Sequence, residues 1–185
     1  MRFNSKLIDF FKRHKLYDEE MFNYLEEHST MIDSDNPEER IITGCAYLID
    51  KNTGILKGLH LNLPYINPRV EDEEMMLDSI HELAHAIFTY PKIGKKFKRD
   101  ITIETLPLLY EKLYIMETMS PKSIAYGRRL DEMVTEEYPE YAFALKAREE
   151  LYSKYHKNPE EMAKIVQKMR QKYRFEQFKN KFHLK

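Results

Sequence analysis

Glycine and cysteine are scarce in this sequence, and tryptophan is absent. Five glycines in 185 residues supply too few flexible turn positions for a β-sandwich or β-barrel, which favours a mainly helical fold. The single cysteine, Cys45, leaves no partner for an internal disulfide. We therefore expect a reducing, cytoplasmic environment and a role for Cys45 as a small core residue.

The sequence also lacks long apolar runs and an excess of charge of either sign. No stretch approaches the roughly 18 apolar residues that a membrane-spanning helix requires. Lys and Arg number 30 against 31 Asp and Glu, so the overall charge gives no reason to expect a nucleic-acid or membrane partner. The charged N-terminal residues do not resemble a signal peptide.

Residues 40–66 give the one β signal that we identify. In their second half, Leu59, Leu61 and Leu63 alternate with polar residues or glycine, as in a strand with one buried face. The turn-forming segment 50–54 separates this strand from an earlier apolar stretch. These residues therefore predict a β-hairpin.

Helices are predicted for most of the remaining chain, which gives a mainly α (α+β) fold in a single domain, 1–185. Apolar residues recur at helical spacing before residue 30 and predict two short amphipathic helices there. Prolines and turn-forming residues separate the later helices. Their predicted ranges are 68–89, 102–119, and three segments within 121–185 that Pro139 and Pro159 divide.

The predicted helix over 68–89 contains His81-Glu82-Leu-Ala-His85, which is the H-E-x-x-H pattern of zinc-dependent hydrolases. Positions i and i+4 share one face of a helix, so His81 and His85 can reach the same ion. Glu82 lies about 100° around the helix from His81, where it can hold an activated water and take its proton. The apolar residues beside this face are Leu77, Ile80, Ala84, Ile87 and Phe88.

A catalytic zinc needs a third protein ligand and an open coordination position. Pro91 stands where a metzincin would have its third histidine, so a carboxylate from the next predicted helix is the better candidate. We predict Glu104 as this ligand and Glu111 as the acceptor of a hydrogen bond from a histidine N–H. Glu111 or Glu117 as the third ligand remains an alternative.

His81-Glu82-x-x-His85 followed by Glu104 resembles the gluzincin arrangement of metallopeptidases. The segment from Glu104 to Glu111 is similar to the second signature of the thimet oligopeptidase and oligoendopeptidase F family, although this chain is much smaller and its proline lies one place later. The resemblance covers roughly a fifth of the chain. It implies a helical, zincin-like core, one Zn²⁺ per chain, and hydrolysis of peptide substrates by an activated water with Glu82 as the general base.

The same resemblance implies a side-chain donor that stabilises the developing oxyanion, supplied by a tyrosine or histidine from a later helix. Several residues of the right type follow the predicted metal site. The candidates are Tyr126, Tyr138, Tyr141, Tyr152, Tyr155 and His156.

The sequence therefore predicts a zinc metallopeptidase that acts on peptides. One alternative is a regulatory metalloprotease like the ImmA/IrrE family, whose members carry a similar His-Glu-Leu-x-His motif in chains of this size. A second is a non-catalytic, zinc-stabilised interaction module that uses the basic residues 163–185. For the peptidase, we expect an extended substrate to add to the edge of the hairpin's second strand.

Overall fold

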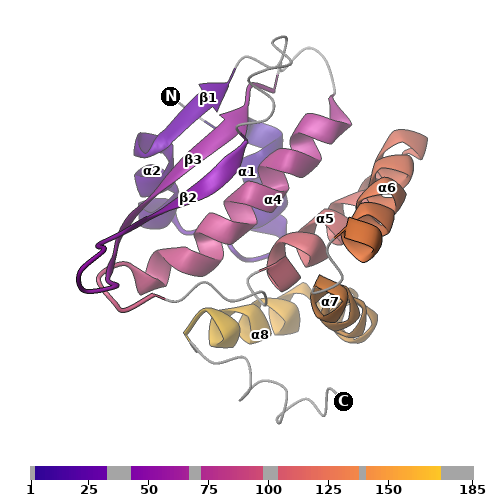
Figure 1. The fold of residues 1–185 in the computed structure, drawn as a ribbon. Coiled ribbons are helices and arrows are strands. Elements are labelled where there is room, and N and C mark those ends of the chain that lie inside the picture. The colour runs from indigo at the N-terminus through magenta and orange to yellow at the C-terminus, as the bar shows by residue number, and fades with distance from the viewer. Residues whose placement is uncertain (1–2, 33–42, 67–71, 98–103, 138–140, 172–185) are drawn as a thin grey trace.

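The computed structural model describes residues 3–32, 43–66, 72–97, 104–137 and 141–171 (Figure 1). These residues are mainly helical and include one small sheet, in agreement with the predicted α+β class. The strands are β1 (Ser29–Ile32), β2 (Gly44–Ile49) and β3 (Leu56–Pro64). The helices are α1 (Ser5–Arg13), α2 (Glu19–Glu27), α4 (Glu73–Thr89), the short 3-10 helix η1 (Tyr90–Lys92), α5 (Thr105–Thr118), α6 (Pro121–Glu137), α7 (Ala142–Tyr155) and α8 (Pro159–Gln171).

The sheet has β3 as its central strand. Strand β2 pairs with β3 antiparallel and forms the predicted hairpin, whereas β1 pairs parallel to the other side of β3 and was not predicted. Leu61 accordingly lies opposite Cys45 in β2 and opposite Ser29 in β1. Because both edges of β3 are occupied, the expectation that a peptide substrate adds to this strand is wrong.

The central strand and the helix that follows it form the middle of the core. Leu59, Leu61 and Leu63 of β3 are fully buried and belong to the same hydrophobic cluster as Ile80 and Ile87 of α4. Helix α4 packs against β3 and β2. Burial of each leucine contributes about 2 kcal/mol, so this packing fixes which face of α4 is turned away from the sheet.

Helix α4 begins at Glu73 rather than at residue 68. The Asp72 side chain accepts a hydrogen bond from the Met75 N–H and caps the helix, and Glu73 and Glu74 occupy its first turn, where the helix dipole favours negative charge. The expected cap at residues 67–68 lies outside the described residues. The helix ends at Thr89, shortly before Pro91, as predicted.

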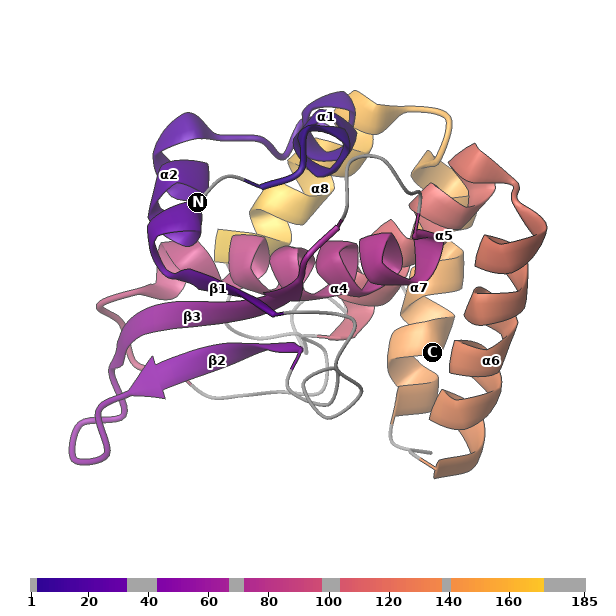
Figure 2. The same ribbon diagram turned by 90° about the horizontal axis from the view of Figure 1, so that it is seen from above.

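The later helices follow the predicted divisions. Helix α5 ends at Thr118, where Met119 adopts a left-handed conformation, and α6 starts at Pro121. Helices α5, α6 and α7 lie together on the side of α4 away from the sheet (Figure 1). Helix α8 packs against α7, η1 and α4 (Figure 2). In the part of the chain that the structure describes, no helix combines the length and hydrophobicity needed to cross a bilayer.

The end of α1 packs against α5 through a buried histidine. His14 Nε2 lies 2.8 Å from Glu117 Oε1, and its ring contacts the rings of Phe10 and Tyr110. Burial lowers the pKa of His14 from its ordinary value of 6.5, although Glu117 opposes this shift. The His14 imidazole therefore binds a proton less readily in the folded protein than in the unfolded chain.

The stability that His14 contributes is expected to be fully present above about pH 6.5 and to be lost as the pH falls through the lower pKa of the folded state. The check is the free energy of urea unfolding in chelator between about pH 7.5 and pH 5. A His14→Gln variant should lose less stability over this interval than the parent chain. An identical pH dependence in both proteins would contradict the assignment.

Candidate metal centre

One side of α4, turned away from the sheet, carries the polar residues of the helix centre. Asp78, His81, Glu82 and His85 fall within an arc of about 100° around its axis, and we call them the ligand face of α4. Helix α5 packs along α4. His85 meets Glu104 at the start of α5 and His81 meets Glu111 two turns later, so the two helices run antiparallel.

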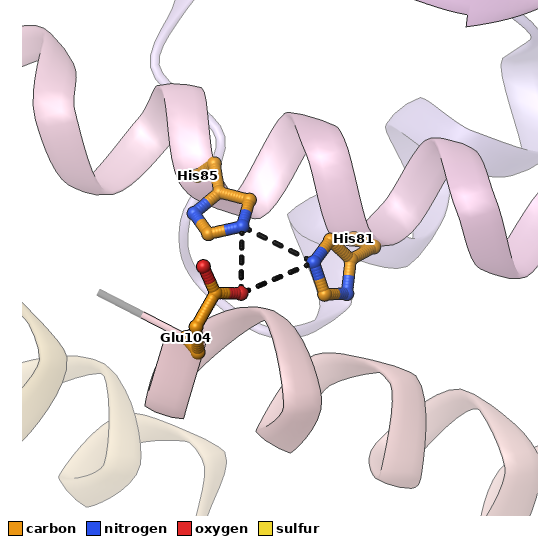
Figure 3. A group of neighbouring side chains, drawn as sticks. All are labelled: His81, His85 and Glu104. Atoms are coloured by element: carbon orange, nitrogen blue, oxygen red, sulfur yellow. Dashed lines mark hydrogen bonds and ion pairs between the residues drawn. The ribbon is translucent and has the colours of Figure 1, made fainter. Parts of the chain in front are cut away.

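The structure brings His81, His85 and Glu104 together into one group that could hold a metal ion (Figure 3). The Nε2 atoms of the two histidines are 3.1 Å apart. Oε2 of Glu104 lies 3.1 Å from Nε2 of His85 and 3.5 Å from Nε2 of His81. In a tetrahedral zinc site with bonds of about 2.0–2.1 Å, neighbouring donor atoms are about 3.3 Å apart. The observed triangle therefore matches the spacing of three ligands around one such ion.

The three donors differ in their exposure to solvent. His85 and Glu104 are buried, whereas His81 and its neighbour Glu82 are partly exposed. Glu104 is the residue that precedes the first turn of α5, where the positive end of the helix dipole favours a carboxylate. The group is therefore anchored in the core by two donors and reachable from solvent on the side of His81 and Glu82.

A second carboxylate of α5 holds the ring of His81. Oε1 of Glu111, itself buried, lies 2.9 Å from Nδ1 of His81. In this arrangement the Nδ1–H donates to Glu111, so Nε2 is the ring nitrogen that faces Glu104 and His85 and that would bind an ion. Such carboxylate contacts fix the tautomer and the orientation of histidines that bind metals.

Glu117, the other sequence-based candidate for the third ligand, lies elsewhere. Its carboxylate pairs with Arg13 and His14 at the end of α1, with an Arg13 Nη2 to Glu117 Oε2 distance of 2.9 Å. Glu117 is thus part of the contact between α1 and α5. Of the three glutamates considered, Glu104 is the one that joins the two histidines in this group.

The electrostatics of the group favour a cation between the donors. Burial opposes ionisation of Glu104, but hydrogen bonds from His81 and His85 hold its pKa far below the ordinary value. Burial also disfavours a charged His81, yet Glu111 and Glu104 raise its pKa well above 6.5. The carboxylates therefore favour a positive charge on or beside the His81 ring.

Sequence reasoning overlooked Asp78, which lies on the ligand face one turn before His81. Burial raises the pKa of Asp78 to about 6, while a hydrogen bond from the Tyr126 hydroxyl opposes the shift and the charge of Glu111 adds to it. The sequence did contain a signal for Asp78: it precedes His81 by three residues and Glu82 by four, which places it on the same helix face as both.

The candidate oxyanion donors are dispersed. Tyr126 of α6 donates its hydroxyl proton to Asp78. Tyr152 and His156 stack on one another at the end of α7, and the Lys112 ammonium lies 4.8 Å from the Tyr152 ring centre. The remaining candidates are Tyr155, which packs against the core, Tyr141, which precedes α7, and Tyr138, which lies outside the described residues.

The roles of Glu104 and Glu111 can be separated by one substitution in each. Glu104→Gln is expected to weaken zinc affinity by tenfold or more, because a neutral amide replaces a charged ligand. Glu111→Gln removes only the charge behind His81 and should cost less, towards the lower end of the roughly 10–100-fold range for such contacts. Competition with a chromogenic chelator measures both. Unchanged affinity in Glu104→Gln together with a large loss in Glu111→Gln would reverse the roles.

Comparison of the chain with protein-family models, with curated proteins and with solved structures finds no match, so the interpretation of this centre rests on its own geometry.

Proposed function

We propose that this chain is a zinc-dependent metallopeptidase of gluzincin type, with one Zn²⁺ held by His81, His85 and Glu104. The observation that carries the proposal is the triangle of two imidazole nitrogens and one carboxylate oxygen with separations of 3.1–3.5 Å. Two histidines and one glutamate form the protein ligand set of several catalytic zinc sites. The H-E-x-x-H spacing adds the glutamate that such sites use as a base.

The donor set favours zinc over the other common divalent cations. Calcium and magnesium prefer shells made entirely of oxygen, whereas imidazole nitrogen suits zinc and its neighbours. Within the described residues, the group comprises three donors. Structural zinc sites usually have four protein ligands, and three ligands with an open position are typical of catalytic sites.

Glu82 and Glu111 supply the rest of the chemistry. Bound zinc would polarise the scissile carbonyl and make a water acidic enough to react near neutral pH. Glu82, partly exposed beside His81, accepts the proton of the attacking water on its carboxylate and delivers it to the leaving amine. Glu111 keeps the Nδ1 proton of His81 engaged and so holds its ring in place.

The carboxylates around the site give independent support for a cation. Glu82 and Glu111 both act electrostatically on His81, and both also act on Asp78. With Glu104 they form a group of four acids beside two histidines. Neighbouring carboxylates repel one another unless a cation compensates their charge.

The direct test combines metal analysis with activity. Purified protein reconstituted with zinc should contain one ion per chain and cleave members of a mixed peptide library, and a chelator should abolish this cleavage. One zinc per chain without any hydrolysis would overturn the peptidase and favour the interaction module. Cleavage of one folded protein at a unique site, with none of short peptides, would instead favour a regulatory protease.

A further inference from the structure

Helix α6 lies against both helices that carry the metal ligands. Toward α4, the Ser123 N–H and hydroxyl both donate to Glu73, and the Tyr126 hydroxyl donates to Asp78. Toward α5, a Cβ atom placed on Gly127 would lie only 2.6 Å from Cδ1 of Ile115, so the backbone of α6 approaches that side chain closely. Adjacent residues of α6 thus contact α4 and α5.

The contact between Tyr126 and Asp78 is the one that reaches the ligand face. Asp78 precedes His81 by three residues, and Ile115 follows Glu111 by four, so α6 contacts each ligand-bearing helix about one turn from the pair formed by His81 and Glu111. Asp78 is not among the three converging donors. A partly buried carboxylate is destabilised unless a donor compensates it, and the Tyr126 hydroxyl is such a donor.

We propose that Tyr126 is a positioning residue for the metal centre: its hydrogen bond to Asp78 fixes α6 against α4, and because α6 also packs against α5, this contact holds the two ligand-bearing helices in their relative position. A metal site tolerates errors of only about 0.2 Å in its bond lengths. Two of its donors come from α4 and the third from the start of α5, so a small change in the separation of these helices weakens the site. Tyr126 thereby serves the metal without touching it.

The proposal rests on the metal-binding part of the proposed function and does not require peptidase activity. Three variants isolate the hydrogen bond. Tyr126→Phe removes the hydroxyl and keeps the ring. Asp78→Ala removes the acceptor and its charge, whereas Asp78→Asn removes the same charge but keeps an oxygen that can accept from Tyr126. Ser123→Ala is the matched control, because it breaks a hydrogen bond between α6 and α4 that is distant from the ligand face.

The readouts are zinc affinity by chelator competition and the visible absorption of the Co²⁺-substituted protein, which reports ligand geometry. Tyr126→Phe and Asp78→Ala should each bind zinc about tenfold more weakly, at the lower end of effects seen for residues behind metal ligands, and should alter the Co²⁺ spectrum. Asp78→Asn and Ser123→Ala should stay within a factor of about three of the parent chain. Thermal melts in chelator check that each variant is folded.

Three results would overturn the proposal. The first is parent-like affinity in both Tyr126→Phe and Asp78→Ala. The second is an equal loss in Asp78→Asn and Asp78→Ala, which would assign the effect to charge. The third is an equal loss in Ser123→Ala, which would assign it to the general packing of α6. If Tyr126→Phe is not recovered folded, the two Asp78 variants decide alone. A parent chain that binds no zinc would instead refute the metal site itself.

Discussion

Substitution of Glu82 by glutamine is expected to lower kcat for peptide hydrolysis by about 10³-fold, within the usual range for removal of a general base, while one zinc per chain remains bound. The reason is geometric. His81, His85 and Glu104 provide the converging donors, and Glu82 is beside them on the ligand face but outside that triangle. Glutamine has nearly the same shape but cannot accept the proton of the attacking water.

The control for this experiment is Glu74→Gln on the same helix. Glu74 is exposed and pairs with Arg129 of α6 at 2.9 Å, in the first turn of α4 and away from the metal ligands. Its substitution should leave kcat and zinc content unchanged. Full activity of Glu82→Gln, or loss of zinc along with activity, would remove the general-base role. If the parent chain binds zinc but has no peptidase activity, Glu82 does not act as a general base in peptide hydrolysis.

Removal of both histidines, in His81→Ala/His85→Ala, is expected to abolish stoichiometric zinc binding. A ligand present at about 1,000 times its Kd stabilises the folded state by about 4 kcal/mol. For a chain of this length, that corresponds to a rise in Tm of about 10 °C. The parent chain should show this rise when zinc is added after chelator treatment, and the double variant should show none.

His60→Ala provides the matched control. His60 belongs to β3, is partly exposed and contacts the Thr30 hydroxyl at 3.0 Å, outside the metal centre. This variant should retain one zinc and the full shift in Tm. If the double variant still carries one tightly bound zinc, the assignment of the ligands to the H-E-x-x-H pattern fails.

Some features of the centre were accessible from sequence because they depend on local geometry. The separation of four residues between His81 and His85 places both rings on one face of any regular helix. Glu104 required one further assumption, that the next helix returns antiparallel. The 18 residues between His85 and Glu104 leave room for such a turn, and the apolar pattern of the second helix supported it. The contact between Glu111 and His81 follows from the same antiparallel pairing.

Other features depend on partners that are distant in sequence. Strand β1 has four residues, too few to show alternation, and it exists through its pairing with β3 some thirty residues later. The contact between Tyr126 and Asp78 joins residues 48 apart, and its existence depends on how α6 packs. The start of α4 was misplaced because Asn67-Pro68 and Asp72 are both plausible caps, and only the hydrogen bond from Met75 selects Asp72.

The division of the ligands between two helices has a consequence for cooperativity. Helix α4 packs against the buried face of β3 on one side and against α5 on the other, and α5 in turn packs with α6 and α7. A metal held by both helices links the unit formed by the sheet and α4 to the unit formed by α5, α6 and α7. With an ion bound in the proposed site, any local opening that separates the two units would have to break a metal–ligand bond. Bound zinc would therefore make the unfolding of these units a single event, whereas without zinc the α5–α7 unit could open before the sheet does.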